Sequence, residues 1–203
     1  MIAIYLAAGQ SRRMGRPKLA LPFGDTTLGS IGLCALLQTK VDYIFVIINP
    51  ADDLLWMDAS LKKELAGRGE IIVCPDSEKG QGFSLRCGVL QAINCSAEKI
   101  IVCLADQPFM TADILEELMA EKMTQKDDYI ACSHQRIIQP PVIFSQKSFS
   151  ALLQMGGDYG AKKIIANGAL QGKKCEFSDE LAFADIDTPK DYQKLLHCYL
   201  MGF

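Results

Sequence analysis

The chain has 203 residues, of which 49% are apolar and 22% are charged, and its formal net charge is −3. This length fits one compact domain over residues 1–203, and the weak negative charge excludes the broad basic face that a nucleic-acid duplex requires. No apolar stretch reaches the roughly 18 residues of a membrane span, and no basic leader precedes the first apolar run. We therefore expect a cytoplasmic protein with neither a nucleic-acid nor a membrane partner.

Short apolar runs rich in Ile and Val alternate with longer segments that have helical periodicity. The runs predict buried strands at Ile2–Ala7, Tyr43–Ile48, Glu70–Cys74 and Lys99–Leu104. The segments between them predict helices at Thr27–Gln38, Asp52–Ala66 and Phe83–Asn94. This repeated strand–helix–strand order predicts an α/β fold in which helices cover both faces of a mostly parallel sheet.

The second half of the chain is less regular. Thr111 is a predicted N-cap of a helix that runs to about Met123. Two further apolar runs predict strands at Tyr129–Cys132 and Val142–Phe144. Near the end, the sequence Thr-Pro-Lys-Asp over residues 188–191 combines an N-cap, a proline at the first helical position and an acid three residues after the cap. It predicts a terminal helix that ends near Leu200.

The segment after the first predicted strand combines small residues with cations. It has the sequence Leu-Ala-Ala-Gly-Gln-Ser-Arg-Arg-Met-Gly-Arg-Pro-Lys over residues 6–18. Ala7, Ala8 and Gly9 allow backbone amides to approach a bulky ligand. A triphosphate needs such amides together with cations at the carboxyl end of a parallel strand. The segment is neither a Walker A loop nor a Gly-x-Gly-x-x-Gly loop, and an exposed, solvated basic turn is the alternative interpretation.

Two acidic segments are candidates for holding a metal ion. Asp106 follows the strand predicted at Lys99–Leu104, so it faces the same edge of the sheet as the first loop. Magnesium takes one or two carboxylates together with phosphate oxygens, which suits this position; the alternative is that Asp106 caps a turn beside Pro108. Asp185 and Asp187 alternate along an extended segment and so point to the same side, although Asp187 also suits the start of the last helix as a favourable charge.

The pattern Leu-Ala-Ala-Gly-x-Ser-x-Arg-Met-Gly-x-x-Lys resembles the signature loop of nucleotidyltransferases with a Rossmann-like, doubly wound fold. It is most similar to that of the molybdenum cofactor cytidylyltransferases, including members that serve xanthine dehydrogenase in purine breakdown. The resemblance extends from Leu6 to Leu195 and implies a three-layer α/β/α fold. It also implies transfer of CMP from CTP to molybdopterin, with release of pyrophosphate. Guanylyltransferase relatives usually carry Gly at the position of Ala8, which favours CTP over GTP.

The resemblance also implies roles for individual residues. Arg13 and Lys18 would grip the triphosphate, and Lys18 would stabilise charge that develops in the transition state. Asp106 matches the family's Asp-Gln-Pro motif and would act in catalysis by binding Mg²⁺ together with Asp187. The nucleotide would be bound by the following residues: Leu6, Ala7, Ala8, Gly9, Arg13, Lys18, Gly80, Gly82 and Ser84.

The segment Gly-Gln-Gly-Phe-Ser-Leu over residues 80–85 resembles the family's Gly-x-Ser-x-Ser-Leu segment, which is expected to approach the nucleobase and ribose. Phe83 stands where the family often has Ser, so side-chain contacts with the base are in doubt. A glycine-rich turn with a helix N-cap at Gly82 or Ser84 explains the composition nearly as well.

Two later segments depart further from the family pattern. Gly-Asp-Tyr-Gly-Ala-Lys over residues 157–162 has Lys162 where the family has Arg, and Asp158 fits a helix cap as well as a ligand contact. Gln139–Pro141 replaces a Gly-His-Pro-like triplet that is expected to line the acceptor pocket. His134 lies nearby. We favour an exposed loop histidine over a residue that contacts phosphate or pterin.

Two other functions remain open at this stage. A triphosphate site of this kind also fits an enzyme that uses GTP or another phosphorylated acceptor, such as a sugar phosphate. A non-catalytic carrier or insertion chaperone for a molybdenum hydroxylase, such as xanthine dehydrogenase, would bind the pterin but would need neither CTP nor Asp106.

Overall fold

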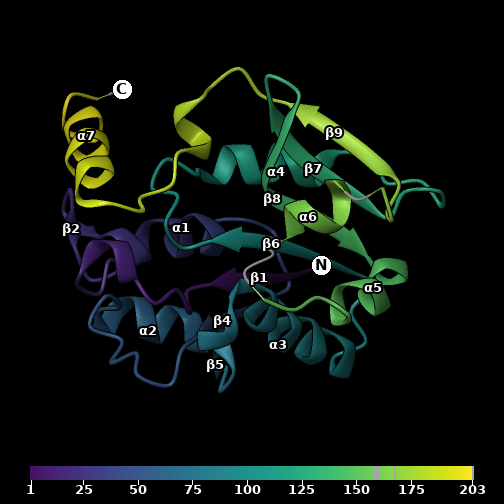
Figure 1. Ribbon diagram of the computed structural model, residues 1–203, viewed down its shortest axis with the longest axis horizontal. Coiled ribbons are helices and arrows are strands. Elements are labelled where there is room, and N and C mark those ends of the chain that lie inside the picture. Colours follow the sequence, from purple (N-terminus) through teal and green to yellow (C-terminus); the bar gives the residue numbers. More distant parts are fainter. Residues whose placement is uncertain (158–160, 167, 203) are drawn as a thin grey trace.

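A seven-stranded sheet forms the centre of the computed structural model, which describes residues 1–157, 161–166 and 168–202 (Figure 1). Its strands are β1 (Ile2–Leu6), β4 (Tyr43–Ile48), β5 (Gly69–Val73), β6 (Lys99–Leu104), β7 (Tyr129–His134), β8 (Ile137–Ser145) and β9 (Gly172–Glu176). Their order is β5-β4-β1-β6-β8-β7-β9, and β8 alone runs antiparallel to its neighbours in the described sheet. A separate hairpin consists of β2 (Pro22–Phe23) and β3 (Thr26–Thr27).

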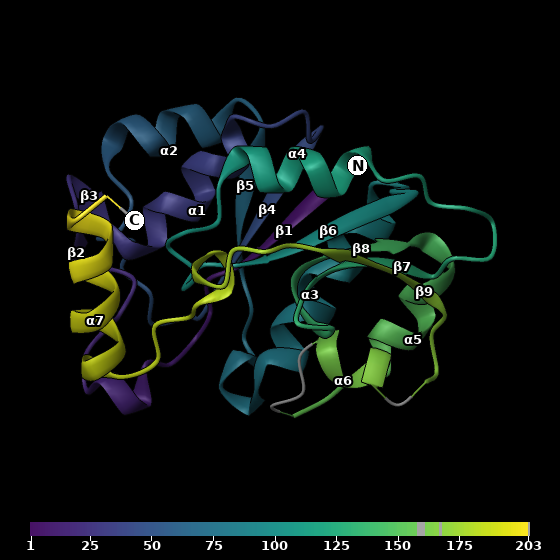
Figure 2. The same cartoon turned by 90° about the horizontal axis from the view of Figure 1, so that it is seen from above.

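Helices cover both faces of the sheet, so the predicted three-layer α/β/α architecture is confirmed (Figure 2). The described helices are α1 (Leu28–Leu37), α2 (Ala59–Ala66), α3 (Gln81–Asn94), α4 (Ala112–Ala120), α5 (Phe149–Leu153), α6 (Ala161–Ala166) and α7 (Pro189–Leu200). One apolar cluster joins α1, α2 and α4 to one face, and a second joins α3, α5 and α6 to the other. Among these helices, none has both the length and the apolar composition that crossing a lipid bilayer demands.

The strand β1 shows why a continuous apolar run becomes a central strand. Ala3 and Tyr5 belong to the cluster on one face, whereas Ile2, Ile4 and Leu6 belong to the cluster on the other. Because successive side chains of a strand point to opposite faces, only an unbroken apolar run can be buried on both.

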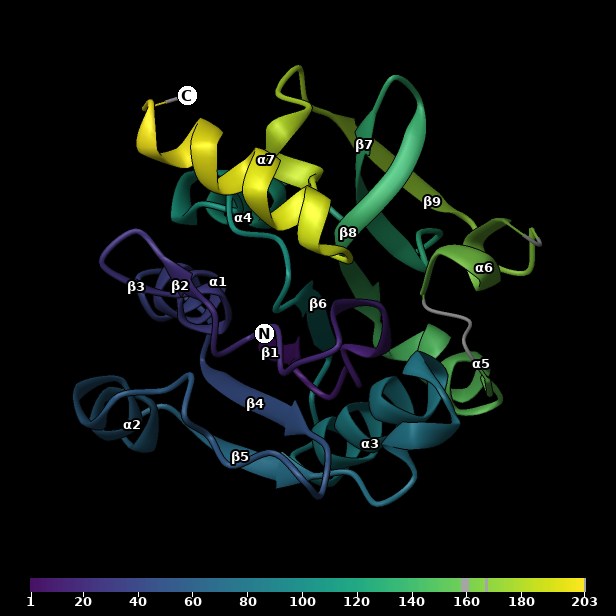
Figure 3. The ribbon, with the colours of Figure 1, turned by 60° about the vertical axis from the view of Figure 1, so that its left-hand side comes forward.

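The carboxyl ends of the parallel strands meet at one edge of the sheet. Leu6 at the end of β1 pairs with Leu104 at the end of β6 and lies beside the end of β4. The helix α7 lies outside the two main layers. Its Leu195 belongs to a third apolar cluster, which also contains Ile186 from the segment before α7, Phe23 of the hairpin and Leu28 of α1. Figure 3 shows this side of the molecule, where the loop after β1 runs between α7 and the start of α3.

Most predicted elements are present, but the helix predicted over Asp52–Ala66 is wrong in its first half. The Asp52 and Asp53 carboxylates accept hydrogen bonds from the amides of Leu54 and Leu55, and Leu54 adopts a left-handed conformation with φ 56°. These local side-chain bonds compete with helix formation, so α2 begins only at Ala59, after Asp58 caps it.

The alternative interpretation with an N-cap at Gly82 or Ser84 is also wrong in its position, because α3 begins at Gln81 with Gly80 as its N-cap. The expected caps at Thr111 and Thr188 are confirmed: each hydroxyl accepts a hydrogen bond from an amide three residues later. The strand β9 and the helix α5 were not predicted.

Candidate functional site

The loop after β1 turns back on itself through two left-handed residues. Ser11 has φ 51° and Gly15 has φ 68°, and they flank a 3-10 turn at Arg12–Met14. The Met14 amide donates to the Ser11 carbonyl at 2.9 Å, and the Met14 side chain is buried beneath the turn. The backbone amide of Lys18 donates to Ser11 Oγ at 3.0 Å. The loop is therefore held by its own contacts, although most of its residues between Gly9 and Pro17 are exposed to solvent.

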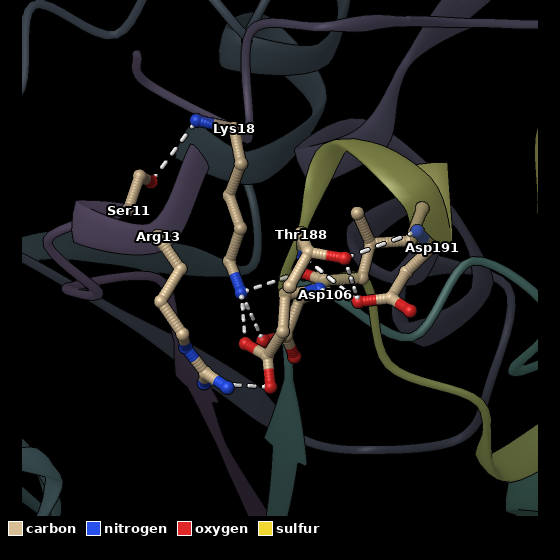
Figure 4. A network of polar contacts seen from close by, with 8 residues as sticks. Ser11, Arg13, Lys18, Asp106, Thr188 and Asp191 are labelled. Atoms are coloured by element: carbon tan, nitrogen blue, oxygen red, sulfur yellow. Dashed lines mark hydrogen bonds and ion pairs between the residues drawn. The ribbon is translucent and has the colours of Figure 1, made fainter. Parts of the chain in front are cut away.

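Lys18 is a buried cation that joins three segments of the chain (Figure 4). The residue is only 7% exposed, and its Nζ donates to Asp106 Oδ2 at 2.6 Å and to Asp187 Oδ1 at 3.2 Å. A third bond, 2.7 Å long, reaches the backbone carbonyl of Ile186. Burial alone lowers the pKa of Lys18, but the charges and hydrogen bonds of the two carboxylates outweigh it, so the pKa is raised above 10.5. Lys18 is therefore a permanent positive charge near neutral pH.

The helix α7 holds Asp187 in place through its N-terminal cap. Asp191 Oδ2 accepts from the amide of Thr188 at 2.8 Å and from the amide of Asp187 at 3.3 Å, and the Thr188 hydroxyl donates to the same oxygen. The Ile186 amide donates to the Asp106 carbonyl at 3.0 Å, which ties this segment to the end of β6. These backbone bonds bring the two carboxylates to the same cation.

Arg13 adds a second positive charge at the same place. Its guanidinium lies 2.8 Å from Asp187 Oδ2, and the Arg13 side chain is 68% exposed. Arg13 can therefore turn toward a ligand at little cost, because an exposed ion pair contributes little to stability. Lys18 is fixed by its surroundings, whereas Arg13 is anchored at one end only.

The carboxylates suit a divalent ion with hard oxygen ligands. Asp106 and Asp187 converge on one cationic group, and the Ile186 carbonyl points at the same position. Magnesium and manganese favour such oxygen donors and complete their coordination with ligand phosphates and water. Within the described ranges, no group of three or more His, Cys, Asp or Glu side chains is placed to hold a metal. The residues therefore fit an ion held by two carboxylates and shared with a bound phosphate.

A cleft of about 530 Å³ opens beside this network, large enough for a nucleotide. One wall is the loop after β1, a second is the turn over residues 77–81 with Ser84, and a third is the end of β6 with Asp187. Ten of the predicted site residues line it: Leu6, Ala7, Ala8, Gly9, Arg13, Lys18, Gly80, Ser84, Asp106 and Asp187. Gly82 is buried behind the wall, where its amide donates to the Gly157 carbonyl at 3.1 Å.

Several other candidates lie away from the cleft or outside the described residues. Asp185 is exposed and does not line the cleft. The segment Gln139–Pro141 belongs to β8 and is also absent from the lining. His134 is a half-buried strand residue rather than an exposed loop residue, and its Nδ1 lies 3.0 Å from the Phe177 carbonyl. Asp158 and the side chain of Lys162 lie outside the described residues.

Sequence reasoning missed three features of the site. It counted Lys18 among the cations of the loop but did not predict that the residue is buried between two acids. It could not find the Ile186 carbonyl, because a backbone group has no side-chain signature. It also gave no role to Ser11, although a serine between a small-residue run and an arginine pair was visible in the loop.

Comparisons with known proteins agree with this geometry. A family model described as "MobA-like NTP transferase domain" matches residues 3–174. The chain is 35% identical to "Purine catabolism protein PucB" of Bacillus subtilis (strain 168), over 95% of this chain and 94% of that protein. It is 27% identical to a "Probable molybdenum cofactor guanylyltransferase" of Geobacillus sp. (strain WCH70), over 97% of this chain and 98% of that protein.

Solved structures show the same architecture. The crystal structure of Rv0371c from Mycobacterium tuberculosis H37Rv matches with a TM-score of 0.80 and 26% identity, over 97% of this chain and 96% of that one. A complex of Rv0371c with manganese matches with a TM-score of 0.74 and 24% identity, over 97% of each chain. From the family match over most of its length and the full-length likeness to PucB, the chain belongs to the MobA-like NTP transferase family and is a nucleotidyltransferase.

Proposed function

We propose that the protein transfers CMP from CTP to the terminal phosphate of molybdopterin, forming the cytosine dinucleotide cofactor and pyrophosphate. The observation that carries this proposal is the meeting of Lys18 with Asp106 and Asp187 on the wall of a nucleotide-sized cleft. Because the resemblance to molybdenum cofactor cytidylyltransferases extends over nearly the whole chain, molybdopterin is the first acceptor to test.

In this reaction an oxygen of the acceptor phosphate attacks the α-phosphorus of CTP. The bond between the α-phosphorus and the oxygen that bridges to the β-phosphate breaks, and pyrophosphate leaves with the electron pair. The attacking oxygen is already anionic, so no general base is needed. Positive charge where negative charge develops comes from Lys18, which its carboxylates hold in place, and from Arg13, which is free to turn. Catalysis then rests on alignment and electrostatic stabilisation.

Asp106 and Asp187 would hold a magnesium ion next to the triphosphate. The ion supplies further positive charge at the phosphate oxygens. The complex of Rv0371c with manganese supports a divalent ion in this family. In this proposal the two carboxylates contact both Lys18 and the ion, so the three side chains act as one unit.

The identity of the base depends on Ala8. Ala8 is 4% exposed and lines the cleft. By the family resemblance, alanine at this position favours cytosine, whereas glycine would leave room for the larger guanine. GTP is the second candidate, because a relative that is 27% identical over 97% of this chain is named a guanylyltransferase.

The likeness to PucB supports a role in purine breakdown. We propose that the cytosine dinucleotide cofactor passes to a molybdenum hydroxylase that oxidises purines, such as a xanthine dehydrogenase.

Pyrophosphate release from CTP and from GTP, measured with Mg²⁺ and molybdopterin, tests the proposal. We expect CTP to be preferred and Ala8→Gly to shift the preference toward GTP. Ala97→Gly is the matched control, because Ala97 is a buried alanine of the same apolar cluster as Ala8 but does not line the cleft, so its change should leave the ratio unchanged. A wild-type preference for GTP would overturn the assignment of CTP. Activation of a hydroxylase by a folded Asp106→Ala variant would instead favour a carrier.

A further inference from the structure

Ser11 makes a contact that its backbone conformation does not require. Its φ of 51° is left-handed, a region in which glycine is the least strained residue. Serine is more strained than glycine would be at this position, and only serine brings a side chain that can make a contact. The side chain has a definite partner: Ser11 Oγ accepts the hydrogen bond of the Lys18 amide at 3.0 Å (Figure 4).

This bond fixes the backbone from which the Lys18 side chain extends. The two residues are seven positions apart, and the turn between them is held by the bond from the Met14 amide to the Ser11 carbonyl. The Lys18 carbonyl accepts from the Leu21 amide at 3.0 Å, so the backbone of Lys18 is held on both of its sides.

The far end of the Lys18 side chain is fixed independently. Its Nζ has three acceptors within 3.2 Å, from Asp106, Ile186 and Asp187. A four-carbon chain held at both ends has little rotamer freedom left, so the ammonium keeps one position in the wall of the cleft. Catalytic groups must be held to within about 0.5 Å of their working geometry by such supporting contacts.

We infer that Ser11 is a positioning residue for Lys18: its hydroxyl fixes the Lys18 backbone so that the ammonium is in place before the nucleotide binds. This inference rests on the proposed function, in which Lys18 stabilises charge in the transition state. Ser11 acts through Lys18 and need not touch the reacting atoms. Its loss therefore lowers kcat more than it raises KM.

Two substitutions separate the hydroxyl from the backbone conformation. Ser11→Gly removes the hydroxyl and suits the left-handed backbone, whereas Ser11→Ala removes the hydroxyl and disfavours that backbone. We expect both variants to lose about tenfold in kcat with KM changed by less than about twofold, in an assay with the nucleotide that the wild-type protein turns over best. Ser11→Gly with wild-type kcat would overturn the inference.

Ser96 provides a matched control. It also has a left-handed backbone, with φ 55°, and it follows α3 on the way into β6, at the opposite edge of the sheet from the cleft. Ser96→Gly and Ser96→Ala repeat the same chemical changes in the same conformation. Both variants should leave kcat unchanged. Their melting temperatures show how much glycine or alanine at a left-handed position changes the stability of the protein.

A double-mutant cycle with Lys18→Met shows whether Ser11 acts through Lys18. In the Lys18→Met background, Ser11→Gly should change the residual kcat by less than about twofold, because there is no ammonium left to position. A further tenfold loss in that background would overturn the positioning role. The exchange of the Lys18 amide hydrogen supplies a readout that does not depend on activity: it should be faster in Ser11→Gly than in wild type.

The same cycle distinguishes the inference from the proposed function. If Lys18→Met is folded and fully active, the triphosphate site itself is wrong and the inference falls with it. If Lys18→Met is inactive and Ser11→Gly is fully active, the site stands and only the inference fails. A preference for GTP over CTP affects neither result, since the assay uses the better nucleotide.

Discussion

Replacing Lys18 by Met tests the centre of the site most directly. Methionine has nearly the same length and is apolar, so it fills the buried path of the side chain and removes only the ammonium. The variant leaves Asp106 without its cation and leaves Asp187 with Arg13 alone. Two carboxylates that converge on one position then face each other without a charge between them.

The expected loss of stability follows from the contact distances. At an effective dielectric constant of about 20, a pair of unit charges at the 2.6 Å of the Lys18–Asp106 contact attracts by about 6 kcal/mol. Desolvation of the charges offsets much of this, and removing one partner of a buried pair costs about 3–5 kcal/mol. The side chains of Asp106 and Asp187 remain 21% and 31% exposed, and water therefore reduces the loss to about 2–3 kcal/mol. For a chain of this size, the melting temperature should fall by roughly 5–10 °C.

Turnover should fall further than stability, by about 10²–10³ in kcat, as is usual when a preorganised charge stabiliser is removed. The assay is pyrophosphate release at saturating nucleotide and Mg²⁺, at a temperature where both proteins are folded. Lys63→Met, on the exposed side of α2, controls for the substitution itself and should change neither quantity. A folded Lys18→Met protein with near-normal kcat would refute the assignment, and an unchanged melting temperature would refute the coupling of the two carboxylates to Lys18.

Three further predictions concern the same network. Asp106→Ala should lower kcat by more than about 100-fold while the protein stays folded, as measured by pyrophosphate release and circular dichroism; near-normal release would show that Asp106 is not needed. The pKa of Lys18 is higher in the folded protein than its ordinary 10.5, so its ion pairs contribute fully below that pH and are lost as pH rises through the folded-state value. The stability difference between wild type and Lys18→Met, measured by urea unfolding, should therefore be constant from about pH 7 to 9.5 and shrink above about pH 10.5; a difference that shrinks already near pH 8 would contradict this. Asp191→Ala removes the capping box of α7 and should lower the free energy of unfolding by about 1 kcal/mol. It should also weaken Mg²⁺ binding, as measured by calorimetry. Removal of the Thr111 cap of α4 is the control, which should not change Mg²⁺ affinity.

The periodicity of the sequence was sufficient to predict the layers of the fold. Strands at residues 43–48 and 99–104 have the predicted bounds, because their apolar runs are buried on both faces and end abruptly. The pattern fails where short polar side chains bond to their own backbone, as Asp52 and Asp53 do ahead of α2. It also fails for β9, whose sequence Gly-Lys-Lys-Cys-Glu has little apolar character and is held at the edge of the sheet by its pairing with β7.

The edge at which the site lies was predictable for a different reason. Parallel strands that are adjacent in a sheet end on the same side, so a loop after β1 and an acid after β6 must lie near each other once the strands pair. Sequence alone does not give the pairing of Lys18 with both acids. Lys18 is 88 residues away from Asp106 and 169 residues away from Asp187 in the sequence. Their contacts depend on how the chain runs from β9 to α7, which no local sequence pattern predicts.

The burial of Lys18 changes what its charge can do. An exposed lysine in a flexible loop would reach a phosphate only after its long side chain had been ordered, and that ordering costs up to about 2 kcal/mol. In this chain the cost has already been met on folding, because the Asp106 and Asp187 carboxylates and the Ile186 carbonyl hold the ammonium in place. The same contacts place a positive charge between the two carboxylates, which offsets their mutual repulsion. A ligand that binds in the cleft therefore meets both the cation and the acidic pair already arranged, which is the condition under which fixed charges lower a barrier most.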